Sequence, residues 1–229
     1  LSILFSTIFR SKLLYFDNTT FKESVMKECS LLFYDVEFLN KLDTNIFLLG
    51  FENGVYDLQN LLFRDGRPDD YLSFTTDMQY LPLSKCSEES KQEIHTFLNQ
   101  ILVKDDIREY VLRLLASILS GSTGDQKFHF WTGTGGNGKS ILIQLFEACL
   151  GQYTEKISIS ILTQKRASSS SATPELVKTK GVRFICLQEP EQRDTMNIGY
   201  LKELTGGDVI TARGLYADTI KFKPQFKMI

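Results

Sequence analysis

TGTGGNGKS, residues 132–140, is the stretch of this sequence that decides the fold. It fits the pattern G-x-x-x-x-G-K-[ST] without a mismatch. The run before it, KFHFWTG, is apolar with aromatic residues and predicts a strand. The run after it, SILIQLFEACLG, predicts a helix over residues 139–150 with Gly151 as its stop. A strand, a glycine loop and a helix in this order predict a phosphate-binding loop held between two stiff elements.

Each residue type in this loop has a chemical reason. Glycines let backbone N–H groups approach a phosphate closely, and the start of the following helix points further N–H groups at the same anion. Lys139 can reach the β- and γ-phosphates, and the Ser140 hydroxyl can bind Mg²⁺. We therefore predict ATP and Mg²⁺ as ligands and Lys139 as a catalytic residue; the alternative is a glycine-rich connector with an incidental lysine. The predicted nucleotide-binding residues are Gly133, Thr134, Gly135, Gly136, Asn137, Gly138, Lys139, Ser140 and Ile141.

The second candidate is an acid at the end of the run VRFICLQEPE, residues 182–191. An NTPase with a phosphate loop needs an acid at the end of a neighbouring strand, where it helps to hold Mg²⁺ and polarises water. Residues 182–187 predict a buried strand, and Pro190 ends it. We predict Glu189 as a catalytic residue and Mg²⁺ ligand, with Glu191 as the fallback; the alternative is an exposed acid in a turn.

Composition limits the classes of function. The chain has 229 residues, and its 26 basic and 28 acidic residues give a net charge of −2. A near-neutral chain has no overall attraction to nucleic acid, so any such site must be a local patch. The four cysteines form no C-x-x-C pair, which does not support a zinc site and fits a reducing compartment. The chain starts at Leu1 and ends in an apolar run, so we expect a fragment of a longer protein.

The chain divides into two predicted regions. Residues 1–40 predict mainly helix, and residues 46–80 predict a small β-containing unit with a turn at Asn53-Gly54. Ser87, followed by glutamates, predicts a helix start, so we place a boundary there. The predicted domains are an N-terminal region, 1–86, and an ATPase core with leading helices, 87–229. The predicted fold class is α/β: a P-loop NTPase (AAA+-like) parallel sheet, truncated at its C-terminal end and preceded by a smaller, mostly helical or α+β region.

A basic hairpin is predicted near the end of the chain. The runs VITAR and TIKFK have strand character and are separated by the turn GLYAD. Basic residues with an aromatic residue among them suit single-stranded DNA, because cations contact phosphates and a ring stacks on a base. The alternative is an ordinary solvated surface. The predicted DNA-binding residues are Lys202, Arg213, Tyr216 and Lys221, with Lys223 close by.

Several segments together resemble a known family. They are TGTGGNGKS, CLGQY, EPE, LKELTGGDVITARGLY and FKPQFKMI, in this order along the chain. The combination resembles the superfamily 3 helicases, and most closely the poxvirus-type primase-helicase branch of large DNA viruses, which is related to phage and plasmid primase C-terminal helicases. ENGVYDL and FTTDMQY resemble the region before the helicase in that branch. The resemblance covers roughly residues 50–229, and KELTGGD with AR-x-LY is its most specific part.

The resemblance implies an AAA+-like hexameric ring that couples ATP hydrolysis to movement along single-stranded DNA. It also implies an upstream primase domain in the same parent chain and an intracellular viral replication site in the host cytoplasm or nucleus. We expect no membrane association, because the apolar opening LSILFSTIF is far shorter than the ~20 residues of a membrane span. The glycine loop matches the family's nucleotide loop, Glu189 its second acidic motif, and residues 202–216 the stretch leading to a DNA-contacting hairpin.

The sequence departs from the family pattern in two ways. Gln188 stands where many related NTPases have a first acid, so metal binding would depend on Ser140, water and Glu189. The family's sensor asparagine and arginine finger would follow Ile229, so we expect this chain alone to hydrolyse ATP poorly. Two other functions stay open: a small-molecule kinase with the same loop, and an assembly module that binds nucleotide without turnover.

Overall fold

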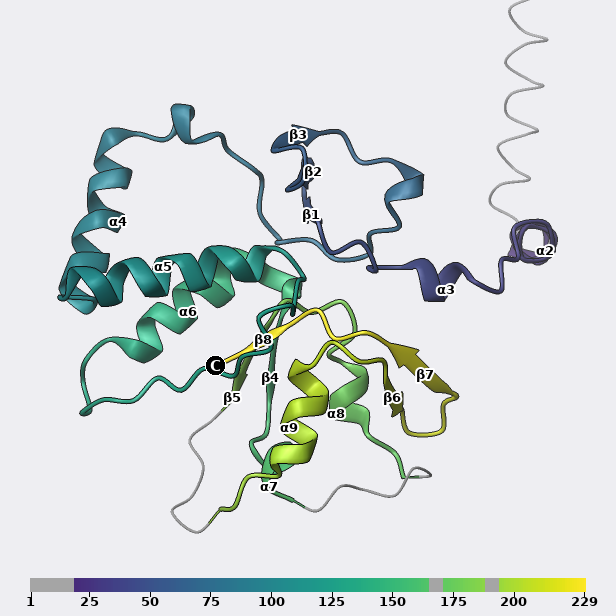
Figure 1. The fold of residues 1–229 in the computed structure, drawn as a ribbon. Helices are drawn as coiled ribbons and strands as arrows, with labels where there is room; N and C mark the ends of the chain where they lie inside the picture. The colour runs from purple at the N-terminus through teal and green to yellow at the C-terminus, as the bar shows by residue number, and fades with distance from the viewer. Residues whose placement is uncertain (1–18, 165–170, 188–193) are drawn as a thin grey trace, which may run out of the picture. The chain divides into compact units, whose positions relative to one another are not determined.

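The computed structural model describes residues 19–164, 171–187 and 194–229 (Figure 1). The chain forms two units, residues 1–40 and residues 41–229. In the first unit, helix α2 spans Thr19–Leu32, within the region predicted as helical, and buries none of its side chains. Helix α3 spans Phe38–Lys41. None of the helices in the described ranges combines the length and apolar character needed to cross a membrane. The domain division between residues 86 and 87 stays a prediction.

The second unit begins with a small antiparallel sheet. Its strands are β1 (Leu48–Phe51), β2 (Gly54–Asp57) and β3 (Leu62–Arg64), in that order. The predicted β-containing unit and its turn are confirmed, because Phe51 pairs directly with Gly54 across the hairpin. Gly54 has a φ of +152°, and a Cβ there would lie 2.6 Å from the carbonyl oxygen of Arg64. Glycine is therefore required where the chain reverses.

A parallel sheet forms the centre of the second unit. Its strands are β4 (Thr154–Ile157), β5 (Phe184–Leu187) and β8 (Lys227–Met228), in the order β4-β5-β8. The predicted α/β fold with a parallel sheet is confirmed at this level. The strand expected at residues 127–131 is reduced to a parallel bridge between Phe128 and Met228, supported by His129 N–H donating to the Met228 carbonyl at 3.1 Å. β8 therefore lies between residue 128 and β5, so the strand before the glycine loop is not the direct neighbour of β5.

Alternating side chains of β5 divide the core into two clusters. Phe184 and Cys186 pack in one cluster, and Ile185 and Leu187 pack in the other, because successive residues of a strand point to opposite faces. The first cluster includes buried residues of α5 (Asp105–Leu119) and α6 (Lys139–Leu150). The second includes residues of α7 (Ser160–Thr163), α8 (Pro174–Val177) and α9 (Ile198–Thr205). The sheet is thus covered on both faces, as parallel sheets usually are.

The predicted helix starts and stops are confirmed. Helix α4 spans Glu88–Ile101, and the Ser87 hydroxyl caps it by accepting from the N–H of Ser90 at 3.1 Å. Gly151 ends α6 with a φ of +52°. The 3₁₀-helices are η1 (Pro68–Asp70), η2 (Leu83–Lys85) and η3 (Gly151–Tyr153).

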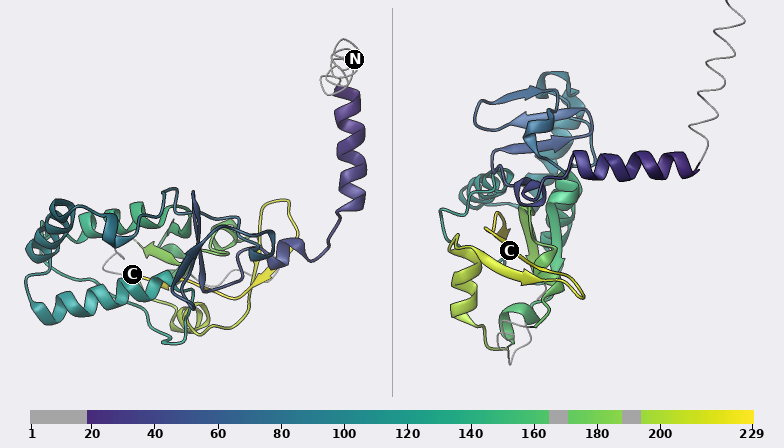
Figure 2. Two further views of the ribbon diagram at one scale, coloured as in Figure 1. Left: turned by 90° about the horizontal axis from the view of Figure 1, so that it is seen from above. Right: turned by 90° about the vertical axis from the view of Figure 1, so that its right-hand side faces the viewer.

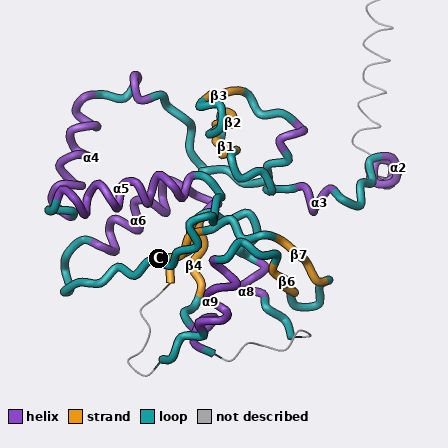
Figure 3. Tube along the Cα trace, in the orientation of Figure 1, coloured by secondary structure: helices purple, strands orange, loops and turns teal. Residues whose placement is uncertain are grey.

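The last elements form the predicted hairpin. Strands β6 (Ile210–Arg213) and β7 (Thr219–Phe222) pair in antiparallel register, with Arg213 opposite Thr219. Figure 2 shows the second unit from two further directions, and Figure 3 shows where its helices, strands and loops lie. In Figures 1 and 2, the small sheet β1–β3 lies beyond the end of the parallel sheet at which β4 begins.

Candidate functional site

The glycine loop follows the bridge at Phe128 by a few residues and runs directly into α6. Gly136 and Gly138 have φ values of +74° and +80°, in the left-handed region that favours glycine. Gly138 is the N-cap of α6, so no side chain caps the start of this helix. The first N–H groups of a helix have no partner within the helix. The start of α6 therefore offers backbone donors next to a loop with unusual backbone geometry.

The glycines of this loop differ in what surrounds them. A Cβ on Gly133 would collide with the amide of Asn137 and lie 3.1 Å from the Lys139 Nζ. By contrast, nothing lies within 4 Å of a Cβ built on Gly135 or on Gly136. The middle of the loop therefore faces open space, while Gly133 is closely packed against side chains of the same loop.

Lys139 is the first residue of α6, and its ammonium group lies beside the loop. Its ammonium group donates to the Asn137 Oδ1 at 2.9 Å, which holds the side chain back over Gly133. Ser140, Thr134 and Ile141 are exposed at the start of α6 and along the loop. The structure thus brings together three of the predicted nucleotide-binding residues, Gly133, Asn137 and Lys139. An incoming anion would compete with Asn137 for the ammonium group.

One side of the loop is supported by the junction of α4 and α5. A Cβ on Gly138 would lie 2.7 Å from the Ile101 Cγ1, so only glycine fits there. At the same junction, the Arg108 guanidinium donates to the carbonyl oxygen of Leu102 at 3.0 Å, just past the end of α4. No local feature of the sequence marks Ile101 as a contact of the loop. The apolar spacing in α4 shows that Ile101 is on a core-facing helix face, but not which loop it touches.

The predicted catalytic acid lies outside the described residues. Glu189 and the fallback Glu191 fall in the range 188–193, so their positions relative to Lys139 and Ser140 stay predictions. The strand that leads to them is described: β5 ends at Leu187, whose N–H donates to the carbonyl oxygen of Ile229 at 2.9 Å.

The thiols on α6 and β5 are poor candidates for covalent chemistry. Burial raises the pKa of the Cys149 thiol. Burial also raises the pKa of the Cys186 thiol, and the nearby Glu147 carboxylate adds to this. A raised pKa keeps a thiol protonated, and only the thiolate is a strong nucleophile.

The hairpin places its basic residues on one exposed face. Thr211, Arg213, Thr219 and Lys221 are exposed, while the alternate residues Ile210, Ala212 and Phe222 are buried. In the register of the two strands, Thr211 lies opposite Lys221, so Arg213 and Lys221 are diagonal neighbours on this face.

The tip of the hairpin presents an aromatic side chain. Tyr216 is fully exposed and has a φ of +55°, a conformation that non-glycine residues adopt rarely. Behind it, the Arg213 Nε donates to the carbonyl oxygen of Ala217 at 3.2 Å across the turn. Lys202, in contrast, lies on α9, where it is exposed outside the two hairpin strands. The structure therefore groups Arg213, Tyr216 and Lys221 on one hairpin.

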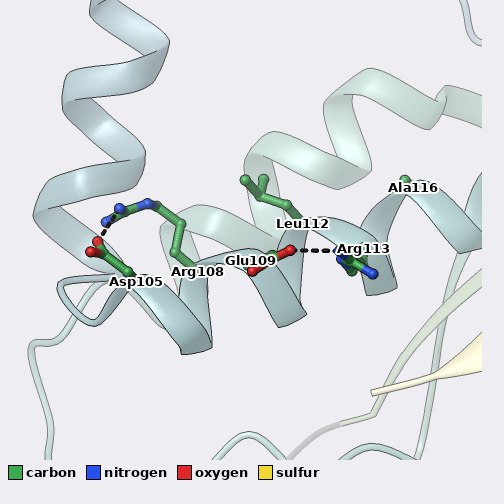
Figure 4. A pocket seen from close by; sticks show the side chains of 6 residues that line it. All are labelled: Asp105, Arg108, Glu109, Leu112, Arg113 and Ala116. Atoms are coloured by element: carbon green, nitrogen blue, oxygen red, sulfur yellow. Dashed lines mark hydrogen bonds and ion pairs between the residues drawn. The ribbon is translucent and has the colours of Figure 1, made fainter.

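A shallow pocket lies along α5, and Figure 4 shows its lining. Two ion pairs flank it: Arg108 with Asp105, and Arg113 with Glu109 at 2.6 Å. It contains none of the predicted site residues. The opposite side of α5 carries the buried residues Val111, Leu114, Leu115 and Ile118, so α5 covers the sheet.

The chain is similar to one known family and to several proteins of large DNA viruses. Residues 4–103 match the family described as "D5 N terminal like". The chain is 47% identical over 211 residues to a protein named "Putative helicase" in Acanthamoeba polyphaga mimivirus, and this match covers 92% of the chain. It is 33% identical over 218 residues to a "Putative helicase" of Invertebrate iridescent virus 3. It is 27% identical over 219 residues to a "Putative primase" of African swine fever virus.

These similarities confirm the resemblance inferred from the sequence motifs. The second and third matches each cover 93% of the chain. The chain in turn spans only 22% of the mimivirus protein, 23% of the iridescent virus protein and 22% of the African swine fever virus protein. The matched part of each relative is therefore a limited segment of a much longer protein.

Proposed function

We propose, on the premise that this chain is a relative of the helicases and primases named in large DNA viruses, that it is the nucleotide-binding part of an ATP-dependent DNA helicase. In this proposal, ATP hydrolysis drives movement along single-stranded DNA during viral DNA replication. The observation that carries the proposal is the geometry of the loop 133–140. Two of its glycines have positive φ values, the ammonium group of its lysine is hydrogen-bonded within the loop, and the helix that follows has no side-chain cap.

The residues present fit a nucleotide with Mg²⁺. The backbone at Gly135 and Gly136 faces open space, as a cradle for phosphates requires. The uncapped start of α6 provides N–H donors, and Lys139 provides a positive charge that only Asn137 holds among the described contacts. When bound, Mg²⁺ would neutralise charge on the β- and γ-phosphates. Ser140 and Glu189 are the residues we propose to hold it.

Each residue of the proposed site then has a defined task. The amides of the loop bind and orient the phosphates, and Lys139 stabilises negative charge on them. Glu189 accepts a proton from the attacking water and orients it. Ile101 keeps the loop in place by filling the space beside Gly138.

The hairpin is the proposed DNA contact. Arg213 and Lys221 would bind phosphates of a single strand, and the exposed ring of Tyr216 would stack on a base. Lys202 would add a phosphate contact from α9. Such contacts are electrostatic and salt-dependent, so this local patch can bind DNA although the chain as a whole is nearly neutral.

The assembly and location are also proposals. We propose a hexameric ring, an upstream primase domain in the parent chain and a replication site inside the infected cell. African swine fever virus supplies the relative named as a primase. No membrane is involved in this proposal.

The function is tested in the full-length parent protein by measuring ATP hydrolysis with and without single-stranded DNA. Four proteins are compared: wild type, Lys139→Ala, Glu189→Gln and Lys104→Ala. Lys104 is exposed between α4 and α5, so its variant is a matched control for loss of a lysine charge. We expect DNA to stimulate the wild type and the control, and each site variant to lose about a hundredfold in rate, since one stabilising group typically contributes that much.

Other outcomes point to other functions. ATP hydrolysis that ignores DNA would favour a small-molecule kinase. Tight nucleotide binding without turnover, together with nucleotide-dependent oligomerisation, would favour an assembly module. Full activity in Lys139→Ala would remove the site assignment.

A further inference from the structure

The three strands of the parallel sheet begin next to the same segment of chain. Tyr153 directly precedes β4, Arg183 directly precedes β5, and Gln225 stands two residues before β8. All three side chains are buried. Each makes a hydrogen bond to the backbone of residues 43–50, which we call the strap. The strap leads into and includes most of β1 of the small antiparallel sheet.

Tyr153 joins the strap to β4. Its hydroxyl accepts from the N–H of Gly50 at 2.9 Å and donates to the carbonyl oxygen of Phe74 at 3.0 Å. The side chain has no exposed surface, and burial raises the pKa of its phenol. Both hydrogen-bonding capacities of the hydroxyl are thus used by backbone groups of the small β unit.

Arg183 joins the strap to β5. Its guanidinium donates to the carbonyl oxygens of Ile46 at 2.8 Å, Asn45 at 2.9 Å and Leu48 at 3.3 Å. The residue is 1% exposed, and burial lowers the pKa of the guanidinium to about 10, so it stays protonated at neutral pH. The planar fork donates from two separate nitrogens, Nη1 and Nη2, whereas a lysine would have to donate to all three carbonyls from one nitrogen.

Gln225 joins the strap to β8. Its Nε2 donates to the carbonyl oxygen of Asp43 at 2.8 Å. Asp43 is itself buried and fixed, because its carboxylate accepts from the N–H of Ser73 at 2.7 Å and from the hydroxyl of Ser73. A further bond runs from the N–H of Gly121 to the carbonyl oxygen of Ile46 at 2.9 Å.

The strap lies at the end of the sheet opposite to the candidate site. In a parallel sheet, the amino ends of all strands lie at one end of the sheet and their carboxyl ends at the other, where ligands bind. The glycine loop follows residue 131, and Glu189 follows the carboxyl end of β5. Arg183 is therefore at the far end of the strand that leads to the proposed catalytic acid.

We infer that the strap is a positioning element of the proposed ATPase and that Arg183 is its principal positioning residue. By fixing the starts of β4, β5 and β8 to one segment, it prevents the short strands from sliding past one another. β5, the strand that leads toward the proposed catalytic acid, is then held at a set height relative to the other strands. Only this last step, the effect on turnover, rests on the proposed function.

The test is made in the full-length parent protein and compares Arg183→Lys and the milder Tyr153→Phe with wild type. Backbone hydrogen exchange is measured over residues 43–50 and 184–187, together with ATP affinity and DNA-stimulated kcat. We expect faster exchange in both segments, ATP affinity within about threefold of wild type, and kcat lower by about tenfold to a hundredfold, because small misplacements of catalytic groups are costly. Tyr153→Phe should show the same pattern more weakly.

Leu162→Ala is the matched control. Leu162 is fully buried in the cluster with Ile185, a cluster to which none of the strap residues belongs, so its loss destabilises the core alone. This variant should lower the thermal midpoint and leave kcat unchanged. Equal loss of kcat in Leu162→Ala at the same loss of stability would overturn the inference, as would wild-type kcat in Arg183→Lys.

Failure of the proposed function gives a different result. If wild type neither binds nor hydrolyses ATP, the ATPase proposal fails, and hydrogen exchange still decides about the strap. Faster exchange in both segments of Arg183→Lys then supports the strap as the element that fixes the sheet. Faster exchange confined to one segment overturns it.

Discussion

The two ends of the parallel sheet use glycine for opposite reasons. Around the strap, a Cβ on Gly50, Gly121 or Gly151 would collide with a carbonyl oxygen or with the Arg183 guanidinium. In the glycine loop, a Cβ on Gly135 or Gly136 would meet no atom within 4 Å. The first set lets the chain pack closely against itself. The second set leaves the backbone open to solvent. This gives up packing contacts, and it is expected where a ligand approaches the backbone.

Gly121→Ala should have the largest effect on stability. Its methyl group would occupy the space of the Arg183 guanidinium and would lie 3.0 Å from the Cβ of Gln225. Displacing a charged group from three buried carbonyls costs at least about 3 kcal/mol, since hydrogen bonds to charged groups and unsatisfied acceptors are each expensive. Urea denaturation of the two proteins measures this loss in the free energy of unfolding.

Gly135→Ala is the matched control at the other end of the sheet. The added methyl group enters open space, and its φ is not positive, so the free energy of unfolding should change by less than about 0.5 kcal/mol. A large loss of stability here, or none in Gly121→Ala, would break the comparison between the two ends.

Tyr153→Phe should come second. It removes the hydroxyl that serves the Gly50 N–H and the Phe74 carbonyl, and leaves the ring in place. An unsatisfied buried backbone group costs about 1–3 kcal/mol. The measurement is again urea denaturation. A neutral result would mean that the strap is held by Arg183 and Gln225 without the phenol.

Gly136→Ala should have a smaller effect on stability and a clear effect on the site. Its φ of +74° costs an L-residue about 1 kcal/mol, although there is space for the methyl group. If the loop binds phosphates, the variant should also bind ATP more weakly, which a calorimetric titration would detect. Wild-type stability and affinity together would show that the left-handed turn has no role.

His129 should give the smallest effect, visible as a pH dependence. It is buried beside Tyr110, and burial lowers the pKa of its imidazole. The unfolded chain then binds more protons than the folded protein between the two pKa values. The stability due to the neutral ring is therefore fully present above the unfolded pKa and falls as the pH drops below about 6.5.

His129→Phe removes this titration. Between about pH 7.5 and 5.5, the free energy of unfolding of the variant should fall less than that of wild type. Chemical denaturation at several pH values makes the measurement. Parallel curves for the two proteins would mean that the imidazole is solvated in the folded state.

Much of the fold near the glycine loop could be predicted, because the signals there are local. The loop motif, the start of α6 and the stop at Gly151 depend on neighbours in the sequence. The Ser87 cap is local as well. The strand expected at residues 127–131 was wrong in extent, because a strand needs a partner and β8 offers only two residues. The position of Glu189 and the DNA contacts stay predictions.

The strap could not be predicted, because it connects residues more than a hundred positions apart. Residues 182–187 were predicted as one buried strand, and the strand begins only at Phe184. One sign was present: Arg183 is a charged residue inside a run that is otherwise apolar and buried. A buried charge needs polar partners, but the sequence does not say that these are the carbonyls of residues 45–48.

The most direct test of the central claim is a calorimetric titration of Mg-ATP into wild type, Lys139→Ala and Lys104→Ala. If the loop 133–140 binds a nucleoside triphosphate, wild type and Lys104→Ala will bind with equal affinity, and Lys139→Ala will bind at least about tenfold more weakly, since a charge-assisted contact contributes about 1.5–3 kcal/mol. Absence of binding in wild type, or equal binding in all three proteins, would contradict the claim.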